Sequence, residues 1–134
     1  TLSYIQDIIE DINYLVNISH EHINNNHSKL KLSQIRGLKD IAALIDLLLK
    51  GSINAFEDNS LKQLGEVLSK KEDIISSIDD KINDQINITK TEDRSPRNTR
   101  LYFNILLKSK DLIRHKIELI ERFYLTTSQL KSNL

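Results

Sequence analysis

The feature that most constrains the fold of this chain is its shortage of residues that interrupt helices. In 134 residues there is one proline, Pro96, and there are only three glycines. A β-sandwich or barrel needs a turn signal every ~8–12 residues, and no stretch shows the period-two alternation of a half-buried strand. The apolar residues, mostly Ile and Leu, recur in steps of three and four. The sequence therefore predicts an all-α fold.

The helices are expected to be long and joined by short polar connections. Ser95-Pro96 is a strong helix start, with Ser as the N-cap and Pro at the first helical position. Ser33 can cap another helix, and that helix is expected to continue through Gly51. The predicted helices cover residues 2–23, 33–56, 61–89 and 96–129. Helices of this length with short connections predict one domain over residues 1–134, an antiparallel four-helix bundle.

Each predicted helix has one apolar stripe. In the first helix the stripe is formed by Ile5, Ile8, Ile9, Ile12, Leu15, Val16 and Ile23, with Ser19 in one position. A few polar residues lie at or near stripe positions elsewhere: Lys71, Asn104 and Ser109. We expect these residues and Ser19 to pack or set register inside the bundle, and a ligand pocket is the alternative.

Charge and composition exclude several classes of function. Residues 1–26 hold four acids and no Lys or Arg, whereas residues 94–134 hold nine cations against three acids, a net of six positive charges. The whole chain is neutral, which argues against general nucleic-acid binding. There is no Cys, which excludes disulfides, thiolate zinc sites and Cys nucleophiles. The longest apolar run, residues 41–49, is far shorter than the ~20 residues of a membrane span.

The sequence has no recognisable catalytic arrangement. A nucleophile elbow, a P-loop and a glycine-rich phosphate loop are all missing. His20, His22 and His27 lack the i, i+4 spacing of a helical metal pair and are interpreted as surface residues. We therefore expect no enzyme activity, no cofactor and no metal site.

Two acid pairs have i, i+4 spacing, Asp7 with Asp11 and Asp80 with Asp84. Both pairs point away from the apolar stripes of their helices, which predicts that these carboxylates face solvent. Asp46, beside an apolar stripe, is also expected to face solvent.

Three arginines gather where the last predicted helix begins. Arg94, Arg97 and Arg100 lie at a helix N-terminus, which already carries partial positive charge. Glu92 and Asp93 can neutralise them locally. Otherwise, the cluster is a candidate contact for a phosphate, an acidic partner or a lipid headgroup.

Three segments together resemble a known family. They are residues 21–27 (EHINNNH), 66–73 (EVLSKKED) and 98–106 (NTRLYFNIL). They are similar to the PhoU-like C-terminal cytoplasmic domain of bacterial inorganic phosphate transporters of the PiT type, and a similar domain follows some sodium–phosphate cotransporters. The resemblance covers nearly the whole chain.

The resemblance implies a PhoU-like bundle that modulates phosphate uptake through contacts with the permease portion of the same transporter. It places the domain on the cytoplasmic side of the bacterial inner membrane, tethered by membrane spans upstream of Thr1. It also implies metal clusters bound by Glu/Asp-x-x-x-Asp motifs. The matching positions here are Ile9, Asn13, Lys110 and Arg114, and a register shifted by two residues would place only Asp7 and Asp11 in the first motif. We therefore do not carry metal binding over.

Two other functions stay open from the sequence. One is a structural or dimerising adaptor, and a homodimer is possible in either case. The other is an anion sensor that uses Arg94, Arg97 and Arg100.

Overall fold

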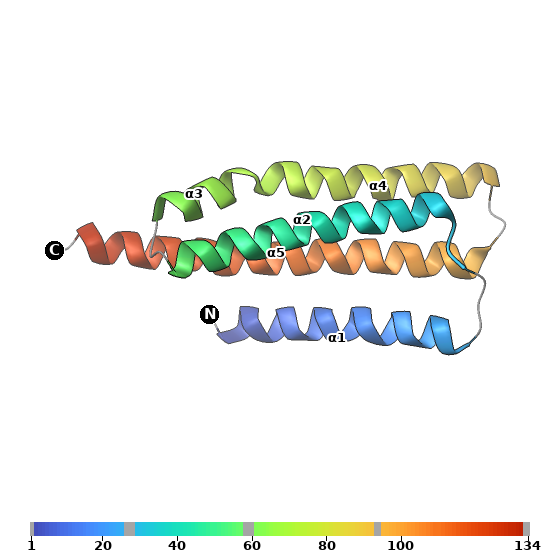
Figure 1. Cartoon of the computed structure of the whole chain (residues 1–134), viewed down its shortest axis with the longest axis horizontal. Helices are drawn as coiled ribbons and strands as arrows, with labels where there is room; N and C mark the ends of the chain where they lie inside the picture. Colours follow the sequence, from blue (N-terminus) through green and yellow to red (C-terminus); the bar gives the residue numbers. More distant parts are fainter. Residues whose placement is uncertain (1, 26–28, 58–60, 93–94, 133–134) are drawn as a thin grey trace.

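The computed structural model describes residues 2–25, 29–57, 61–92 and 95–132. Within these ranges the chain is helical apart from short connections (Figure 1), so the predicted all-α class is confirmed. The helices are α1 (Leu2–Asn24), α2 (Leu32–Glu57), α3 (Leu61–Ser69), α4 (Lys71–Glu92) and α5 (Pro96–Ser132).

The predicted helix ends agree closely with the structure. Helix α2 runs through Gly51 without a break. Helix α5 begins at Pro96, and the carbonyl of Ser95 accepts the first bond of the helix, from the amide of Thr99 at 3.1 Å. This is the geometry of an N-cap residue, whose carbonyl already belongs to the helix.

The single helix predicted over residues 61–89 is wrong, because the chain turns at Lys70 between α3 and α4. The Lys70 amide donates to the carbonyl of Val67, three residues back, at 3.3 Å. The Ser69 hydroxyl donates to the carbonyl of Glu66 at 2.8 Å. Such local bonding by serine competes with the regular ladder of backbone bonds and favours a turn.

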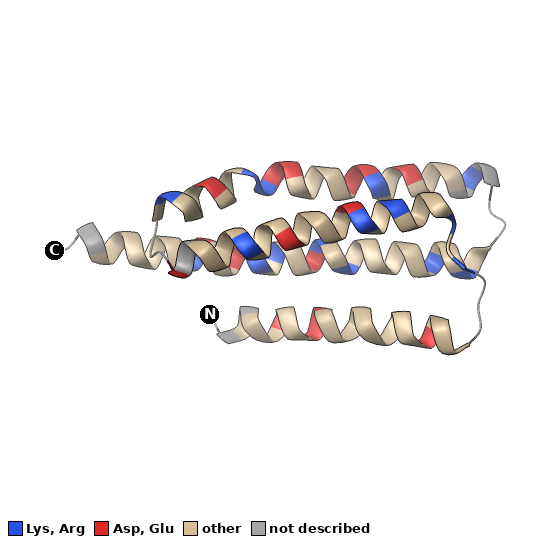
Figure 2. Cartoon of the chain, in the orientation of Figure 1, with Lys and Arg blue, Asp and Glu red and all other residues tan. Residues whose placement is uncertain are grey.

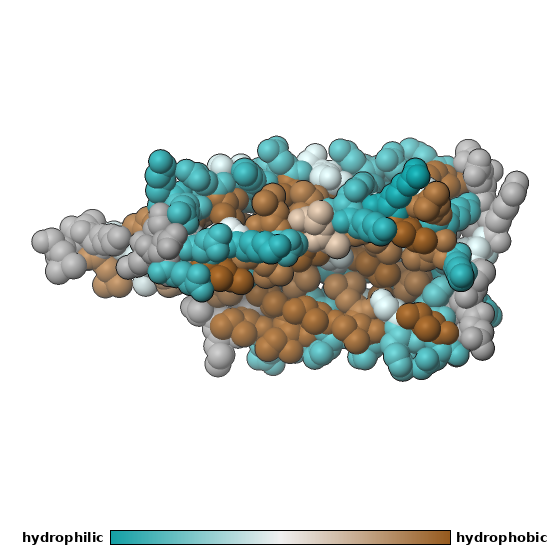
Figure 3. All heavy atoms as spheres, viewed as in Figure 1, coloured by the Kyte–Doolittle hydropathy of each residue, from teal (hydrophilic) through white to brown (hydrophobic). Residues whose placement is uncertain are grey.

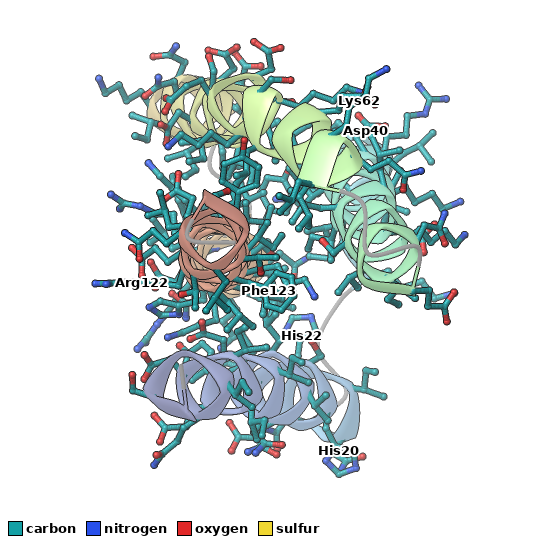
Figure 4. All side chains as sticks on the ribbon, turned by 90° about the vertical axis from the view of Figure 1, so that its left-hand side faces the viewer. His20, His22, Asp40, Lys62, Arg122 and Phe123 are labelled. Atoms are coloured by element: carbon teal, nitrogen blue, oxygen red, sulfur yellow. The ribbon has the colours of Figure 1, made fainter. Side chains whose placement is uncertain are left out.

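Helix α5 is the centre of the molecule and contacts all four other helices, as the end view in Figure 4 shows. Half of the buried apolar side chains come from α5, and the described residues of α1 contribute none. The buried apolar set is Ile41, Leu48, Leu64, Ile74, Ile78, Tyr102, Leu106, Ile113, Ile117 and Ile120. The core is therefore built by α2 to α5, and α1 lies outside it.

No described helix is long and apolar enough to cross a membrane.

Candidate functional site

Helix α1 is attached to the rest of the molecule on one side only. Among the described residues it packs against α5 and against no other helix. Its attached side is formed by Ile8, Asp11, Leu15, Ile18 and His22, which follow one another in steps of three and four and are buried or half-buried. This spacing places them on a single face of the helix.

The centre of the attached side is polar. Asp11 is buried, with only 4% of its surface exposed. One of its oxygens, Oδ1, accepts from Lys108 Nζ at 3.1 Å, and the other, Oδ2, lies 2.8 Å from His115 Nδ1. The prediction that Asp11 faces solvent is thus wrong. Of the apolar stripe assigned to this helix, only Ile8 and Leu15 lie on the side that packs on α5. Asp11 was judged against the whole stripe and was therefore placed on the wrong side.

Lys108 joins α1 to α5 through a second contact. Its Nζ lies 5.1 Å from the centre of the Tyr14 ring, within the range of a cation–π interaction. The hydrogen bond to Asp11 raises the pKa of Lys108, and burial opposes this more weakly. The ammonium is therefore held in its charged form at the contact between the two helices.

Most of the predicted apolar stripe of α1 is uncovered. Ile5, Ile9, Ile12, Val16 and Ile23 are between 42% and 72% exposed. Figure 3 shows apolar side chains along α1, on the face of the molecule where α2 is also visible. We call these five residues the outer seam. The sequence had predicted one apolar face for this helix, and the structure leaves most of that face in solvent.

A small apolar groove lies beside the outer seam, between α1 and α2, with α5 as its floor. Its cavity volume is about 70 Å³. Apolar side chains from all three helices line it, together with one cation: Ile8, Ile12, Ile45, Leu48, Leu49, Leu112, Ile113 and Lys116. Burial lowers the pKa of Lys116, and no described side chain forms an ion pair with it. A desolvated cation without a counterion is unfavourable, so the groove suits an occupant that is apolar and carries an acid.

The predicted arginine site stays a prediction. Arg97 and Arg100 are both exposed on the first turns of α5, and Arg94 lies outside the described residues. His27 also lies outside them, whereas His20 is exposed on α1 and bonds to Asn24 at 3.2 Å. Figure 4 shows His20 at the edge of the molecule, away from α5.

Three of the remaining predicted acids are exposed as expected, and Asp7 is not fully so. Asp80 and Asp84 are exposed on α4, and Asp46 is exposed on α2 with Lys50 Nζ at 2.7 Å. Asp7, one turn before Asp11, is half-buried. Within the described ranges, no three His, Asp or Glu side chains lie close enough together to hold a metal ion.

The polar residues within the stripes play local packing roles. Ser19 donates to the Leu15 carbonyl at 2.7 Å, and Ser109 is buried in α5. Lys71 Nζ lies 2.6 Å from Glu121 Oε1, a contact that raises the pKa of Lys71. Asn104 is half-buried. None of these four residues lines a described pocket.

Sequence reasoning missed a group of buried amides at the end of the bundle where α5 begins. Gln34 of α2 and Gln85 of α4 are joined by a 3.5 Å hydrogen bond. Asn98 of α5 donates to the carbonyl of Lys29 at 2.9 Å. All three are at most 4% exposed. No pattern within a single sequence distinguishes such amides from surface ones.

Two wider clefts accompany the groove. One, of about 390 Å³, lies between α2 and α3, and the other, of about 280 Å³, lies between α2 and α4. The second is lined by both signs of charge, Arg36 and Lys81 with Asp40 and Asp84, and Lys81 already pairs with Asp40 at 2.9 Å. This cleft is a mixed, charged surface, whereas the seam and groove are almost wholly apolar and are therefore the more distinctive surface.

Comparison with protein-family models, with curated proteins and with solved structures finds no match for this chain.

Proposed function

We propose that this chain is a regulatory helical module that acts by protein contact and has no catalytic activity of its own. The observation that carries the proposal is the outer seam of α1, five large apolar side chains left in solvent beside an apolar groove. Exposed apolar surface that is contiguous usually marks a protein contact site. The described residues also lack the clustered titratable groups that metal chemistry requires.

The same proposal extends to the process that is regulated. Residues 21–27, 66–73 and 98–106 resemble the PhoU-like domain of PiT-type inorganic phosphate transporters. Their described residues lie at the end of α1, at the turn between α3 and α4, and at the start of α5. On this basis we propose an antiparallel four-helix bundle of the PhoU type. It modulates phosphate uptake by contacts within a transporter assembly, tethered at the cytoplasmic side of the membrane.

A direct test begins with the reading frame that encodes the chain. Several apolar membrane spans upstream of Thr1 are expected, and a reading frame without any would overturn the link to transport. In cells that depend on this transporter, initial rates of labelled phosphate uptake are then compared with and without residues 1–134. The rate or its response to internal phosphate should change on removal. Unaltered uptake would refute a regulatory role.

Point variants then locate the contact surface. Ile9→Glu with Val16→Glu places charges on the outer seam and should reproduce the effect of removing the whole module. Leu125→Glu is the matched control, since Leu125 is 55% exposed on α5, away from the seam. Equal effects of the seam variant and the control would argue against the seam as the functional surface.

A further inference from the structure

We infer that the outer seam of α1 binds the same seam of a second copy of this chain, so that two copies pair through α1 about a two-fold axis. The inference rests on the proposed function, because it names the partner of the contact surface described above. Four features of the described residues support it: the spacing of the seam, the charges beside it, the charge of the groove and the area exposed.

The spacing of the seam is that of a coiled coil. Ile5, Ile9, Ile12 and Val16 follow one another in steps of four, three and four, and the pattern continues through Ser19 to Ile23. Steps alternating between three and four keep side chains on one line that faces a partner helix. The line covers 19 residues, from Ile5 to Ile23, or roughly 27 Å of helix. Helix α1 therefore presents about two and a half heptads of an unpaired coiled-coil seam.

The residues beside the seam allow it to meet its own copy. In a coiled coil the positions on either side of the seam decide which partner is accepted. Here they carry no Asp, Glu, Lys or Arg. The free side has Gln6, Asn13 and His20, and the other side, with Ile8, Leu15 and His22, is the one attached to α5. The four acids of residues 1–26 occupy other positions on the helix. Two copies can therefore approach without like charges meeting along the seam.

The groove favours an acidic helix over a basic one. Its only charged lining residue is Lys116, whereas α1 contains acids and no Lys or Arg, as Figure 2 shows. An α1 from a second copy that lies along the groove thus brings no Lys or Arg towards this cation. A membrane surface fits less well, because helices that lie on membranes usually carry Lys and Arg on their polar face.

The available area is close to that of a stable interface. The outer seam is extended across the groove by Leu49 and Ile53 of α2, which are 39% and 50% exposed. Together these residues expose on the order of 700 Å², against the ~800 Å² per partner that a standard interface buries. A two-fold contact uses the same patch on both copies, so one patch of this size is sufficient.

The first measurement is the mass of the 134-residue chain by sedimentation equilibrium over a range of concentrations. The expected species is a dimer, with twice the 15.5 kDa mass of the chain. Ile9→Glu with Val16→Glu should weaken the dimer at least 100-fold, and Leu125→Glu should leave it intact. Circular dichroism confirms that each variant remains helical. A wild-type chain that stays monomeric at high concentration would overturn the inference.

A mixing experiment identifies the contact independently of any loss of folding. A second chain carries Ile9→Lys with Val16→Lys. Each charged variant alone should be monomeric. An equimolar mixture of the two should form a 1:1 heterodimer, because the Glu side chains on α1 of one chain then face the Lys side chains on α1 of the other. Helical variants that fail to associate on mixing would refute pairing of α1 with α1.

The two proposals fail in different ways. If the chain is monomeric but the seam variant still alters phosphate uptake, another partner occupies the seam: the inference falls and the proposed function stands. Cosedimentation of the monomer with phosphatidylglycerol-containing vesicles, lost in the seam variant, would overturn the inference in favour of a lipid surface. A dimer that needs the seam, with uptake insensitive to seam charges, would support the inference and refute the seam as the surface through which uptake is regulated.

Discussion

Replacing Asp11 with Ala tests how α1 is held on α5. The substitution removes one buried carboxylate that two side chains of α5 contact, Lys108 at 3.1 Å and His115 at 2.8 Å. Hydrogen bonds to charged groups contribute about 1.5–3 kcal/mol each, and breaking a fully buried ion pair costs about 3–5 kcal/mol. The Lys108 and His115 side chains remain 28% and 30% exposed. They regain water when Asp11 is lost, so we expect the free energy of unfolding to fall by about 2–3 kcal/mol.

The loss should be concentrated in α1. Because α1 packs on α5 alone among the described helices, weakening this contact favours local opening of α1 while the core of α2 to α5 stays closed. Amide hydrogens of α1 should then exchange roughly 30- to 150-fold faster through local opening, and those around Leu106 and Ile113, which open only with the core, should remain far slower in absolute rate. Urea unfolding at one fixed protein concentration gives the global value, and hydrogen exchange gives its location.

The controls separate the carboxylate from general effects on the helix. Glu10→Ala removes an exposed acid from the same helix and should change stability by less than ~0.5 kcal/mol. In a double-mutant cycle, Asp11→Ala and Lys108→Met should show a coupling energy of about 1–2 kcal/mol. If Asp11→Ala were no more destabilising than Glu10→Ala, the argument that Asp11 holds α1 in place would be refuted.

Three further predictions concern the core and the groove. A Cβ at Gly37 would overlap the Tyr102 hydroxyl, so Gly37→Ala should lower the urea midpoint by the equivalent of about 1–3 kcal/mol of stability. At Gly65 the nearest neighbour of a Cβ would be 4.0 Å away, so Gly65→Ala should raise the urea midpoint through better helix propensity. Equal effects of the two variants would contradict this. Burial raises the pKa of Tyr102 above its ordinary value of 10.0, so its contribution to stability is complete below pH 10 and is lost as the pH rises through the raised pKa. Tyr102→Phe should therefore make the alkaline loss of stability shallower, as measured by urea unfolding between pH 8 and 11. An unchanged pH profile would refute the raised pKa of Tyr102 as the cause of that loss. Lys116→Met removes a desolvated ammonium from the groove, so it should raise the melting temperature of the dilute chain. A lower melting temperature would mean that Lys116 has a stabilising partner.

The helices themselves could be predicted because the signals for them are local. Ser95-Pro96 marks the start of α5 at the predicted residue. The spacing of Ile53 and Phe56 from Leu49 in the sequence indicated that α2 continues through Gly51, as it does. The turn at Lys70 was missed because it depends on how Ser69 bonds to Glu66, and serine is common in unbroken helices as well.

The candidate site was harder to predict, because it depends on which side of α1 meets α5. The helix carries two stripes with steps of three and four. The more apolar one, through Ile5, Ile9 and Ile12, is exposed, and the one that contains Asp11 is attached. Asp11 lies 97 residues from Lys108 and 104 from His115 in the chain. Contacts at such separation leave no trace in a single sequence, although the positive excess of residues 94–134 was compatible with an acidic partner inside the molecule.

The one-sided attachment of α1 has a thermodynamic consequence for any partner. Docking of α1 on α5 and occupation of its outer seam are linked equilibria, because the groove beside the seam exists only while Ile8 and Ile12 of α1 face Leu112 and Ile113 of α5. A partner that needs this groove binds only the docked form, and it stabilises docking by RT ln(1 + [L]/Kd). By reciprocity, a change that loosens Asp11 from Lys108 and His115 lowers the apparent affinity for that partner without touching the seam. The polar contact beneath α1 thereby sets how strongly the surface above it can bind.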